Sequence, residues 1–195
     1  MKILVTGGVG FIGTNLIKRL VEDGHDVVSL DNYTTGNIEN EQDGCKYINC
    51  ELSDDIARHG AWGLTHFQLD KPDVIFHIAA LARIQPSFDT PVESFKSNVL
   101  ATQNILEYAR LNDVPIIYAG SSSKHGNIYS NPYTFTKWQG EELCKLYYEI
   151  YNLNVTICRF YNVYGPYQLT EGPYCTVIGI FQKLYENNKP LTITG

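Results

Sequence analysis

The chain has 195 residues, of which 44% are hydrophobic and 18% are charged, and its formal net charge at pH 7 is −6. A negative net charge gives no electrostatic reason to expect nucleic acid as a partner. No apolar run in the sequence approaches the roughly 20 residues that a bilayer-spanning helix needs. We therefore expect one globular domain with neither a nucleic-acid partner nor a membrane partner.

The five cysteines are scattered along the chain, with no Cys-x-x-Cys pair and no histidine cluster beside them. This pattern is typical of free thiols in a reducing compartment, and it offers no set of metal ligands. The N-terminal residues also lack the long apolar region of a signal peptide. We expect a cytoplasmic protein that has no disulfide framework and no metal site.

The hydrophobic pattern alternates between strands and helices along the chain. A strand at residues 3–5 leads into a helix at 11–22, followed by strands at 27–30, 46–48 and 73–78. A helix at 92–111, a strand at 115–119, a helix at 133–151, a strand at 155–158 and a helix at 177–186 complete the series. Residues 53–71 show no clear period, and residues 191–194 begin an element that the chain does not finish. The alternation predicts an α/β fold, a doubly wound parallel sheet of Rossmann type with helices on both faces.

The turn after the first predicted strand is rich in glycine, and residues 7–13 read GGVGFIG. Glycines at this spacing allow positive φ, let the backbone approach a pyrophosphate, and let the helix pack closely on the strand. The N-terminus of the following helix offers free N–H groups and a positive dipole end to phosphates. Asp31 ends the next strand, where a carboxylate accepts hydrogen bonds from ribose hydroxyls and repels a 2′-phosphate. These features predict a site for NAD in preference to NADP.

Tyr133 and Lys137 stand at i and i+4 in a predicted helix, so the phenol and the ammonium share one face. An ammonium near a phenol favours the phenolate, which makes Tyr133 a usable acid or base. Tyr185 and Lys189 have the same spacing, but no hydroxyl-rich strand end precedes them. The serines at 121–123 end the strand before Tyr133, and ligands of open α/β sheets bind at that edge. The pair at Tyr133 is therefore the candidate for catalysis.

Several motifs together resemble one protein family. They are GGVGFIG at 7–13, DNYTTG at 31–36, FHIAA at 76–80, Asn98, SSS at 121–123, Tyr133 with Lys137, and RFYNVYGP at 159–166. On these motifs, which run nearly end to end, the chain resembles the extended short-chain dehydrogenase/reductases of the NAD-dependent epimerase/dehydratase family. UDP-glucose 4-epimerase is typical of that family.

The resemblance implies a catalytic set of Tyr133, Lys137 and Ser121, with Ser122 as the close second to Ser121. It implies that the substrate contacts Ser121, Tyr133 and Asn162. Glu51 departs from the family, which usually has Asp at that position. The residues that the resemblance assigns to the cofactor are Gly7, Gly10, Phe11, Ile12, Gly13, Asp31, Asn32, Tyr33, Thr34, Thr35, Gly36, Glu51, Leu52, Ala79, Ala80, Leu81, Ala82, Asn98, Tyr133, Lys137 and Tyr161.

The activity that the resemblance implies is that of a nucleotide-sugar 4-epimerase with NAD as its cofactor. In that reaction Tyr133 removes the proton of the C4 hydroxyl, Lys137 tunes Tyr133, Ser121 holds the hydroxyl, and a transient 4-keto sugar forms. Two other enzymes of the family stay open, a reductase and a 4,6-dehydratase. In the latter an Asp-Glu pair is typical where this chain has Ser122-Ser123. A fourth interpretation is a non-catalytic NAD-binding module.

Relatives in the family continue past the point that matches residues 191–195, and the continuation supplies much of their sugar site. We therefore expect residues 1–195 to form the NAD-binding domain, with 162–195 as the start of a substrate-binding region that is largely absent. Family members often dimerise through helices that correspond to residues 92–111 and 133–151, which implies a homodimer with a four-helix interface. Lys124-His125-Gly126 stands where the family commonly reads Val-Tyr-Gly, and we assign His125 no catalytic role.

Overall fold

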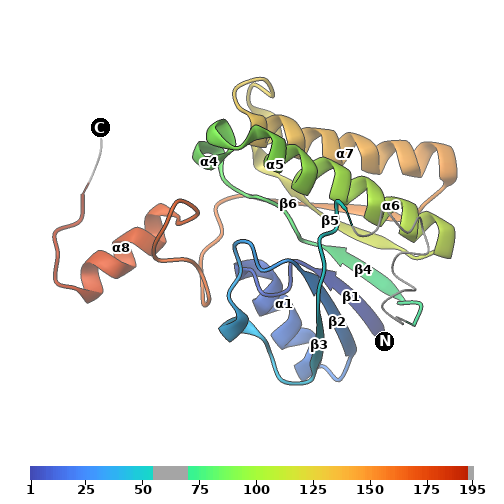
Figure 1. Ribbon diagram of the computed structural model, residues 1–195, viewed down its shortest axis with the longest axis horizontal. Coiled ribbons are helices and arrows are strands. Elements are labelled where there is room, and N and C mark those ends of the chain that lie inside the picture. The colour runs from blue at the N-terminus through green and yellow to red at the C-terminus, as the bar shows by residue number, and fades with distance from the viewer. Residues whose placement is uncertain (55–69, 193–195) are drawn as a thin grey trace.

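Figure 1 shows the computed structural model of the chain, which describes residues 1–54 and 70–192. Within these ranges six parallel strands form a sheet in the order β3-β2-β1-β4-β5-β6. The strands are β1 (Lys2–Thr6), β2 (Asp26–Asp31), β3 (Cys45–Asn49), β4 (Val74–His77), β5 (Ile116–Ser121) and β6 (Val155–Phe160). The order reverses between β1 and β4, as in a Rossmann fold, so the predicted fold class is confirmed.

Helices cover both faces of the sheet (Figure 1). α1 (Phe11–Glu22) packs on one face, and α6 (Ala101–Asn112) and α7 (Pro132–Tyr151) pack on the other. The short helices α4 (Ile84–Asp89) and α5 (Pro91–Phe95) contact α7, whereas α8 (Val177–Glu186) stands apart from the sheet near the C-terminus. No helix in the described ranges has both the length and the apolar character that crossing a bilayer requires.

The two faces of the sheet are built from alternate residues of the same strands, because side chains along a strand point to opposite sides. Ile3 and Val5 of β1 belong to the buried cluster that includes Ile17 of α1. Leu4, between them, belongs to the cluster that includes Ile105 of α6. Strands covered on both faces are apolar at consecutive positions, which explains the short apolar runs in the sequence.

Most element bounds agree with the sequence predictions. α1 and α8 span the predicted residues 11–22 and 177–186, and β5 extends beyond the predicted end to include Ser121 as its last residue. The short helix α4 was not predicted, because its six residues include Pro86 and complete too few turns for a helical period to show. Residues 53–71, for which the sequence predicts no element, fall mostly outside the described residues. Of the element predicted at 191–194, residues 191 and 192 have no regular structure and the rest lies outside.

The helix predicted at residues 92–111 is continuous but changes its winding in the middle. α5 leads into a π-helical turn, η3 (Lys96–Leu100), and the turn leads into α6. A π turn contains one residue more than an α turn and often occurs at functional sites. This one carries Asn98, whose side chain is buried among polar partners on the loop after β4.

Candidate functional site

A cleft of about 820 Å³ opens at the carboxyl edge of the sheet, between the loops that follow the neighbouring strands β1 and β4. Ligands of open α/β sheets bind at this kind of edge. The predicted site residues that line it are Gly7, Gly10, Phe11, Ile12, Gly13, Asp31, Asn32, Thr34, Thr35, Gly36, Glu51, Leu52, Ala79, Ala80, Leu81, Ala82, Ser121, Ser122, Tyr133, Lys137, Tyr161 and Asn162. Tyr33 and Asn98 are the two predicted residues that do not line it.

The glycine loop forms one wall of the cleft. Gly7 has a φ of +77°, and a Cβ there would lie 2.8 Å from backbone atoms of Ala79, so only glycine lets these two loops touch. At Gly10, in contrast, the nearest atom to such a Cβ would be 3.4 Å away, because this residue faces the cleft. Phe11 begins α1 next to it, and the first N–H groups of a helix have no partner inside the helix. The open backbone surface and the free N–H groups fit a dinucleotide pyrophosphate.

Asp31, the last residue of β2, lies at the same wall with a side chain that backbone groups hold in place. Its Oδ2 accepts a hydrogen bond from the N–H of Val9 at 3.1 Å, and its Oδ1 accepts one from the N–H of Tyr33 at 2.8 Å. Burial raises the pKa of the Asp31 carboxyl above its ordinary value, while these N–H groups act in the opposite direction. The carboxylate is thus oriented beside the glycine loop, where an adenosine ribose would lie in a dinucleotide site.

Glu51 is also held by its neighbours. Its Oε2 accepts a hydrogen bond from Asn32 Nδ2 at 2.6 Å, and its Oε1 accepts from the N–H and hydroxyl of Ser53 at 3.1 and 2.9 Å. Burial acts to raise the pKa of Glu51, but the hydrogen bonds from Ser53 and Asn32 outweigh it and lower the pKa. The Glu51 side chain is therefore fixed as an anion on the cleft wall.

Asn98 does not line the cleft but holds Leu81, which does. Its Oδ1 accepts the N–H of Leu81 at 2.8 Å, and its Nδ2 donates to the carbonyl of Leu81 at 3.2 Å and to Thr136 Oγ1 at 3.0 Å. The π turn thereby fixes the loop after β4, which lines the cleft. Tyr33 has a φ of +58°, and its hydroxyl donates to Glu41 at 2.5 Å, on the exterior side of the loop.

Tyr133 and Ser121 meet on the opposite wall. Asn131 caps α7 by accepting the N–H of Thr134 at 2.8 Å, which sets Tyr133 in the first turn. The phenol of Tyr133 donates a hydrogen bond to Ser121 Oγ at 3.3 Å. Ser121 Oγ also lies 2.9 Å from Ser123 Oγ and accepts the N–H of Ser123 at 3.2 Å. Ser121 is therefore the serine in contact with the phenol, while Ser122 lines the cleft.

Lys137 lies one helical turn after Tyr133 and lines the same cleft. Its side chain is buried, and its Nζ lies 4.4 Å from the centre of the Tyr118 ring, a cation–π geometry. Burial lowers the pKa of Lys137 to about 8. The residue is therefore still mostly protonated at neutral pH, and it places a positive charge one helical turn from Tyr133.

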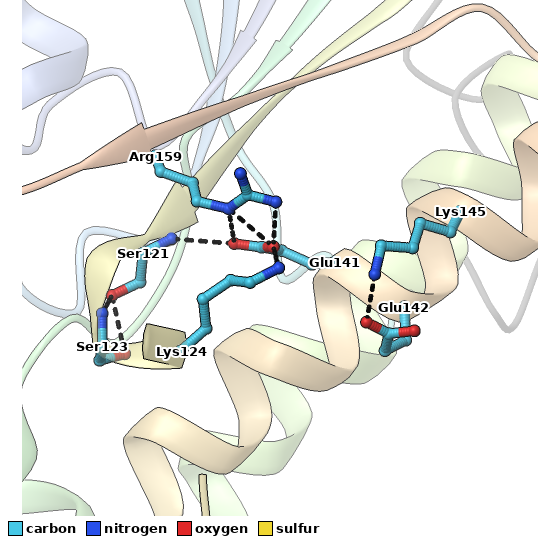
Figure 2. Close-up of polar contacts among 7 residues, drawn as sticks. All are labelled: Ser121, Ser123, Lys124, Glu141, Glu142, Lys145 and Arg159. Carbon is cyan, nitrogen blue, oxygen red and sulfur yellow. Dashed lines mark hydrogen bonds and ion pairs between the residues drawn. The ribbon is translucent and has the colours of Figure 1, made fainter. Parts of the chain in front are cut away.

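Sequence reasoning missed an ion cluster beside this wall (Figure 2), in which the buried Glu141 pairs with the part-exposed Lys124 and Arg159. Glu141 of α7 is 1% exposed, and its carboxylate pairs with Lys124 of the 3-10 turn η4 (Ser122–His125) and with Arg159 of β6. The one indication of this cluster in the sequence was that Glu141 follows Lys137 by one turn on the same helix face. Its two partners stand 17 and 18 residues away in other elements, so the pairing could not be read from local spacing.

Known proteins are similar to this chain in sequence. Residues 3–195 match the family described as "NAD dependent epimerase/dehydratase family". The UDP-glucose 4-epimerase of Mycolicibacterium smegmatis is 33% identical over 217 residues, which cover 100% of this chain and 66% of that protein. The UDP-N-acetyl-alpha-D-glucosaminuronate decarboxylase of Bacillus cytotoxicus is 29% identical, over 100% of this chain and 64% of that protein.

The fold agrees with solved structures as well. The crystal structure of UDP-glucose 4-epimerase from Thermotoga maritima with UDP-glucose has a TM-score of 0.90 at 28% identity, over 100% of this chain and 66% of that chain. The chain thus spans 64% to 66% of the length of these three proteins. The family match confirms the resemblance inferred from the motifs and, since the family is NAD dependent, the prediction of that cofactor.

Proposed function

Since the chain belongs to the NAD-dependent epimerase/dehydratase family, we propose that it is the cofactor-binding part of a nucleotide-sugar 4-epimerase. The contact between Tyr133 and Ser121 carries this proposal, because it places an acid/base group and a hydroxyl together in the cleft. The proposed substrate is a UDP-sugar, the class named for the epimerases to which the chain is similar.

Four residues of the chain have a role in the proposed reaction. Tyr133 takes the proton of the C4 hydroxyl through its phenolate oxygen and later returns it. Ser121 Oγ holds that hydroxyl by a hydrogen bond, and Ser123 fixes Ser121 Oγ from the other side. The buried ammonium of Lys137 lies one helical turn from Tyr133 and supplies a positive charge to this part of the cleft. NAD, when bound, supplies the chemistry of accepting a hydride from C4 and giving it back.

The residues after Ser121 favour an epimerase over a 4,6-dehydratase. Elimination of water from the sugar needs an acid and a base beside C5 and C6. The chain has Ser122 and Ser123 at the positions that follow Ser121, and both are hydroxyls of low acidity. Exchange of the hydride at C4 needs no further acid or base beyond Tyr133.

Tyr133→Phe tests the proposal. The purified chain is mixed with NAD and with UDP-glucose, UDP-galactose, UDP-N-acetylglucosamine or a UDP-uronic acid, and the sugars are separated by chromatography. We expect the wild-type chain to form the C4 epimer, and Tyr133→Phe to bind NAD with little or no epimer formed. Tyr185→Phe is the matched control, because Tyr185 has the same spacing to Lys189 but is 79% exposed on α8.

The other products identify the alternatives. Carbon dioxide from the uronic acid would indicate a decarboxylase, and a 4-keto-6-deoxy sugar would indicate a dehydratase. NAD binding without any sugar product would favour a non-catalytic module. Epimerisation that survives in Tyr133→Phe would show that the role assigned to Tyr133 is wrong.

We further propose that the chain acts in the cytoplasm as a homodimer, with residues 162–195 as the start of the substrate-binding region. Large apolar side chains are exposed on the helices that the resemblance assigns to a four-helix interface, including Val92, Leu146 and Ile150 at 59%, 50% and 65% exposure. The segment after β6 leaves the sheet before α8, which is consistent with a separate role for that region (Figure 1). Sedimentation equilibrium of the wild type and of Ile150→Glu tests the dimer.

A further inference from the structure

We propose that Glu141 is a positioning residue, which holds Ser121 in the geometry that the reaction requires. The proposal rests on the proposed function, in which Ser121 Oγ holds the reacting hydroxyl, and it identifies what fixes Ser121 in turn. Glu141 does not line the cleft, so it acts through Ser121 and not on the substrate.

The carboxylate of Glu141 joins three elements (Figure 2). Its Oε1 accepts the backbone N–H of Ser121, at the end of β5, at 3.4 Å. Its Oε2 accepts from Lys124 Nζ, on η4, at 2.9 Å and from Arg159 Nε, on β6, at 3.0 Å. Burial acts to raise the pKa of Glu141, but hydrogen bonds from Arg159 and Lys124 outweigh it and lower the pKa. Glu141 is therefore an anion with its donors in place.

These contacts act on both the backbone and the hydroxyl of Ser121. A Cβ at Gly120 would lie 2.7 Å from Glu141 Oε1, so the backbone directly before Ser121 passes against the carboxylate. Lys124 stands in the same 3-10 turn as Ser123, whose hydroxyl and N–H contact Ser121 Oγ. The carboxylate therefore fixes the Ser121 backbone directly and orders, through Lys124, the turn that holds the Ser121 hydroxyl.

The same residue ties together the helix and the strand that carry the reacting pair, Tyr133 and Ser121. Glu141 lies two turns after Tyr133 on α7, so its bond to Ser121 ties the helix that presents the phenol to the strand that presents the serine. α7 also packs unusually closely on β5, since a Cβ at Gly140 would collide with the hydroxyl of Tyr118. With the helix this close, the 3.3 Å contact between Tyr133 and Ser121 depends on the Glu141 anchor.

The next residue on the helix offers a matched control (Figure 2). Glu142 pairs with Lys145 at 2.6 Å on the outer surface of α7, with side chains 41% and 49% exposed. Glu141→Gln and Glu142→Gln make the same chemical change one residue apart, but only the first removes the charge beside Ser121. The test compares both variants with the wild-type chain.

Three quantities are measured on each protein: NAD affinity, amide hydrogen exchange across residues 119–126, and kcat and KM for the UDP-sugar that the wild type turns over. In Glu141→Gln we expect faster exchange in that segment, a kcat lowered about 100-fold by the displaced serine, and little change in KM or in NAD affinity. Glu142→Gln should match the wild type in all three.

Unchanged exchange and unchanged kcat in Glu141→Gln would overturn the proposal. So would a loss of NAD affinity as large as the loss of kcat, because that pattern is general unfolding of the site. A wild-type chain that turns over no sugar refutes the proposed function, and the exchange measurement then decides the role of Glu141 alone.

Lys124→Met keeps the test decisive if Glu141→Gln does not fold. It leaves Arg159 on the carboxylate and removes only the link to the turn that carries Ser123. We expect faster exchange confined to residues 122–126, a kcat lowered about 10-fold, and unchanged NAD affinity. Exchange and kcat equal to those of the wild type would contradict the proposed link.

Discussion

The hydroxyl of Tyr133 donates to Ser121 Oγ at 3.3 Å, which joins the first turn of α7 to the last residue of β5. This contact distinguishes two serines that the sequence could only rank. Ser121 is 7% exposed and its hydroxyl has three polar neighbours, whereas Ser122 begins the following 3-10 turn.

Ser121→Ala and Ser122→Ala should therefore differ in effect. Loss of the Ser121 hydroxyl removes the hydrogen bond to the reacting group, and we expect kcat for epimerisation to fall about 100-fold or more. Ser122→Ala should change kcat less than about threefold. Steady-state kinetics with saturating NAD measure both, and a larger loss in Ser122→Ala would show that the serines have been assigned in the wrong order.

Lys137 should make the free energy of unfolding rise with pH above pH 8. Its pKa is lowered by burial to about 8 in the folded chain, from an ordinary value of 10.5. Between these values the unfolded chain binds a proton that the folded chain has released, so a rise in pH favours the folded chain. The contribution is at most about 3 kcal/mol.

Urea unfolding of Lys137→Met at several pH values tests this effect. The variant should lack the rise, while Lys145→Met, which alters a 49% exposed lysine on the same helix, should keep it. An identical pH dependence in wild type and Lys137→Met would contradict the prediction.

His77 should make the chain sensitive to acid. Burial, with a smaller contribution from the charge of Lys137, lowers the pKa of His77 to about 3 from an ordinary 6.5. Its ring nitrogens contact Thr6 Oγ1 at 2.7 Å and Thr102 Oγ1 at 3.0 Å, partners that suit the neutral ring. As pH falls from 6.5 towards 3, the unfolded chain gains a proton that the folded chain excludes, so stability is lost by up to about 5 kcal/mol.

Acid titrations followed by circular dichroism check this prediction. His77→Gln should be less stable at neutral pH but should lose less stability on acidification than the wild type. His125→Gln, at an exposed position, should behave as the wild type does. If His77→Gln lost as much stability in acid as the wild type, another group would have to be responsible.

Asp31→Asn should shift the cofactor preference towards NADP. The substitution keeps an oxygen for one of the two N–H donors, Val9 or Tyr33, and removes the negative charge that repels a 2′-phosphate. We expect about a tenfold loss of NAD affinity and a smaller loss, or a gain, for NADP. Isothermal titration with both cofactors measures the ratio, and Asp26→Asn, at the far end of β2, serves as the control. Equal losses for both cofactors would argue against charge repulsion.

The sequence predicted the parts of the fold that depend on local pattern. α1 is amphipathic and follows a glycine turn, so its bounds and the cofactor loop before it were both visible. β5 and α7 were predicted too, and with them the meeting of Ser121 and Tyr133 at one edge of the sheet. Periodicity and turn residues are sufficient for the helices and strands, because each is complete within one segment. The rule that ligands bind at the carboxyl edge of a parallel sheet was sufficient for the meeting of Ser121 and Tyr133.

Features that depend on tertiary contact could not be predicted in this way. The ion pairs of Glu141 could not be predicted from the sequence of α7 alone. Its two donors come from η4 and β6, and they reach Glu141 only when α7 packs on the sheet. Asn98 was predicted near the cofactor, but the π turn that carries it and its hydrogen bond to Leu81 could not be predicted from the sequence. The choice between Ser121 and Ser122 likewise needed the end of β5 to be fixed.

The π-helical turn at residues 96–100 has a consequence for the evolution of this helix. Because a π turn holds one residue more than an α turn, it is equivalent to a single-residue insertion in an otherwise regular helix. A related protein with one residue fewer in this segment would form an unbroken α-helix, and the Asn98 amide would swing away from Leu81. A one-residue gap here, in an alignment, would thus identify relatives that must hold the loop after β4 by other means.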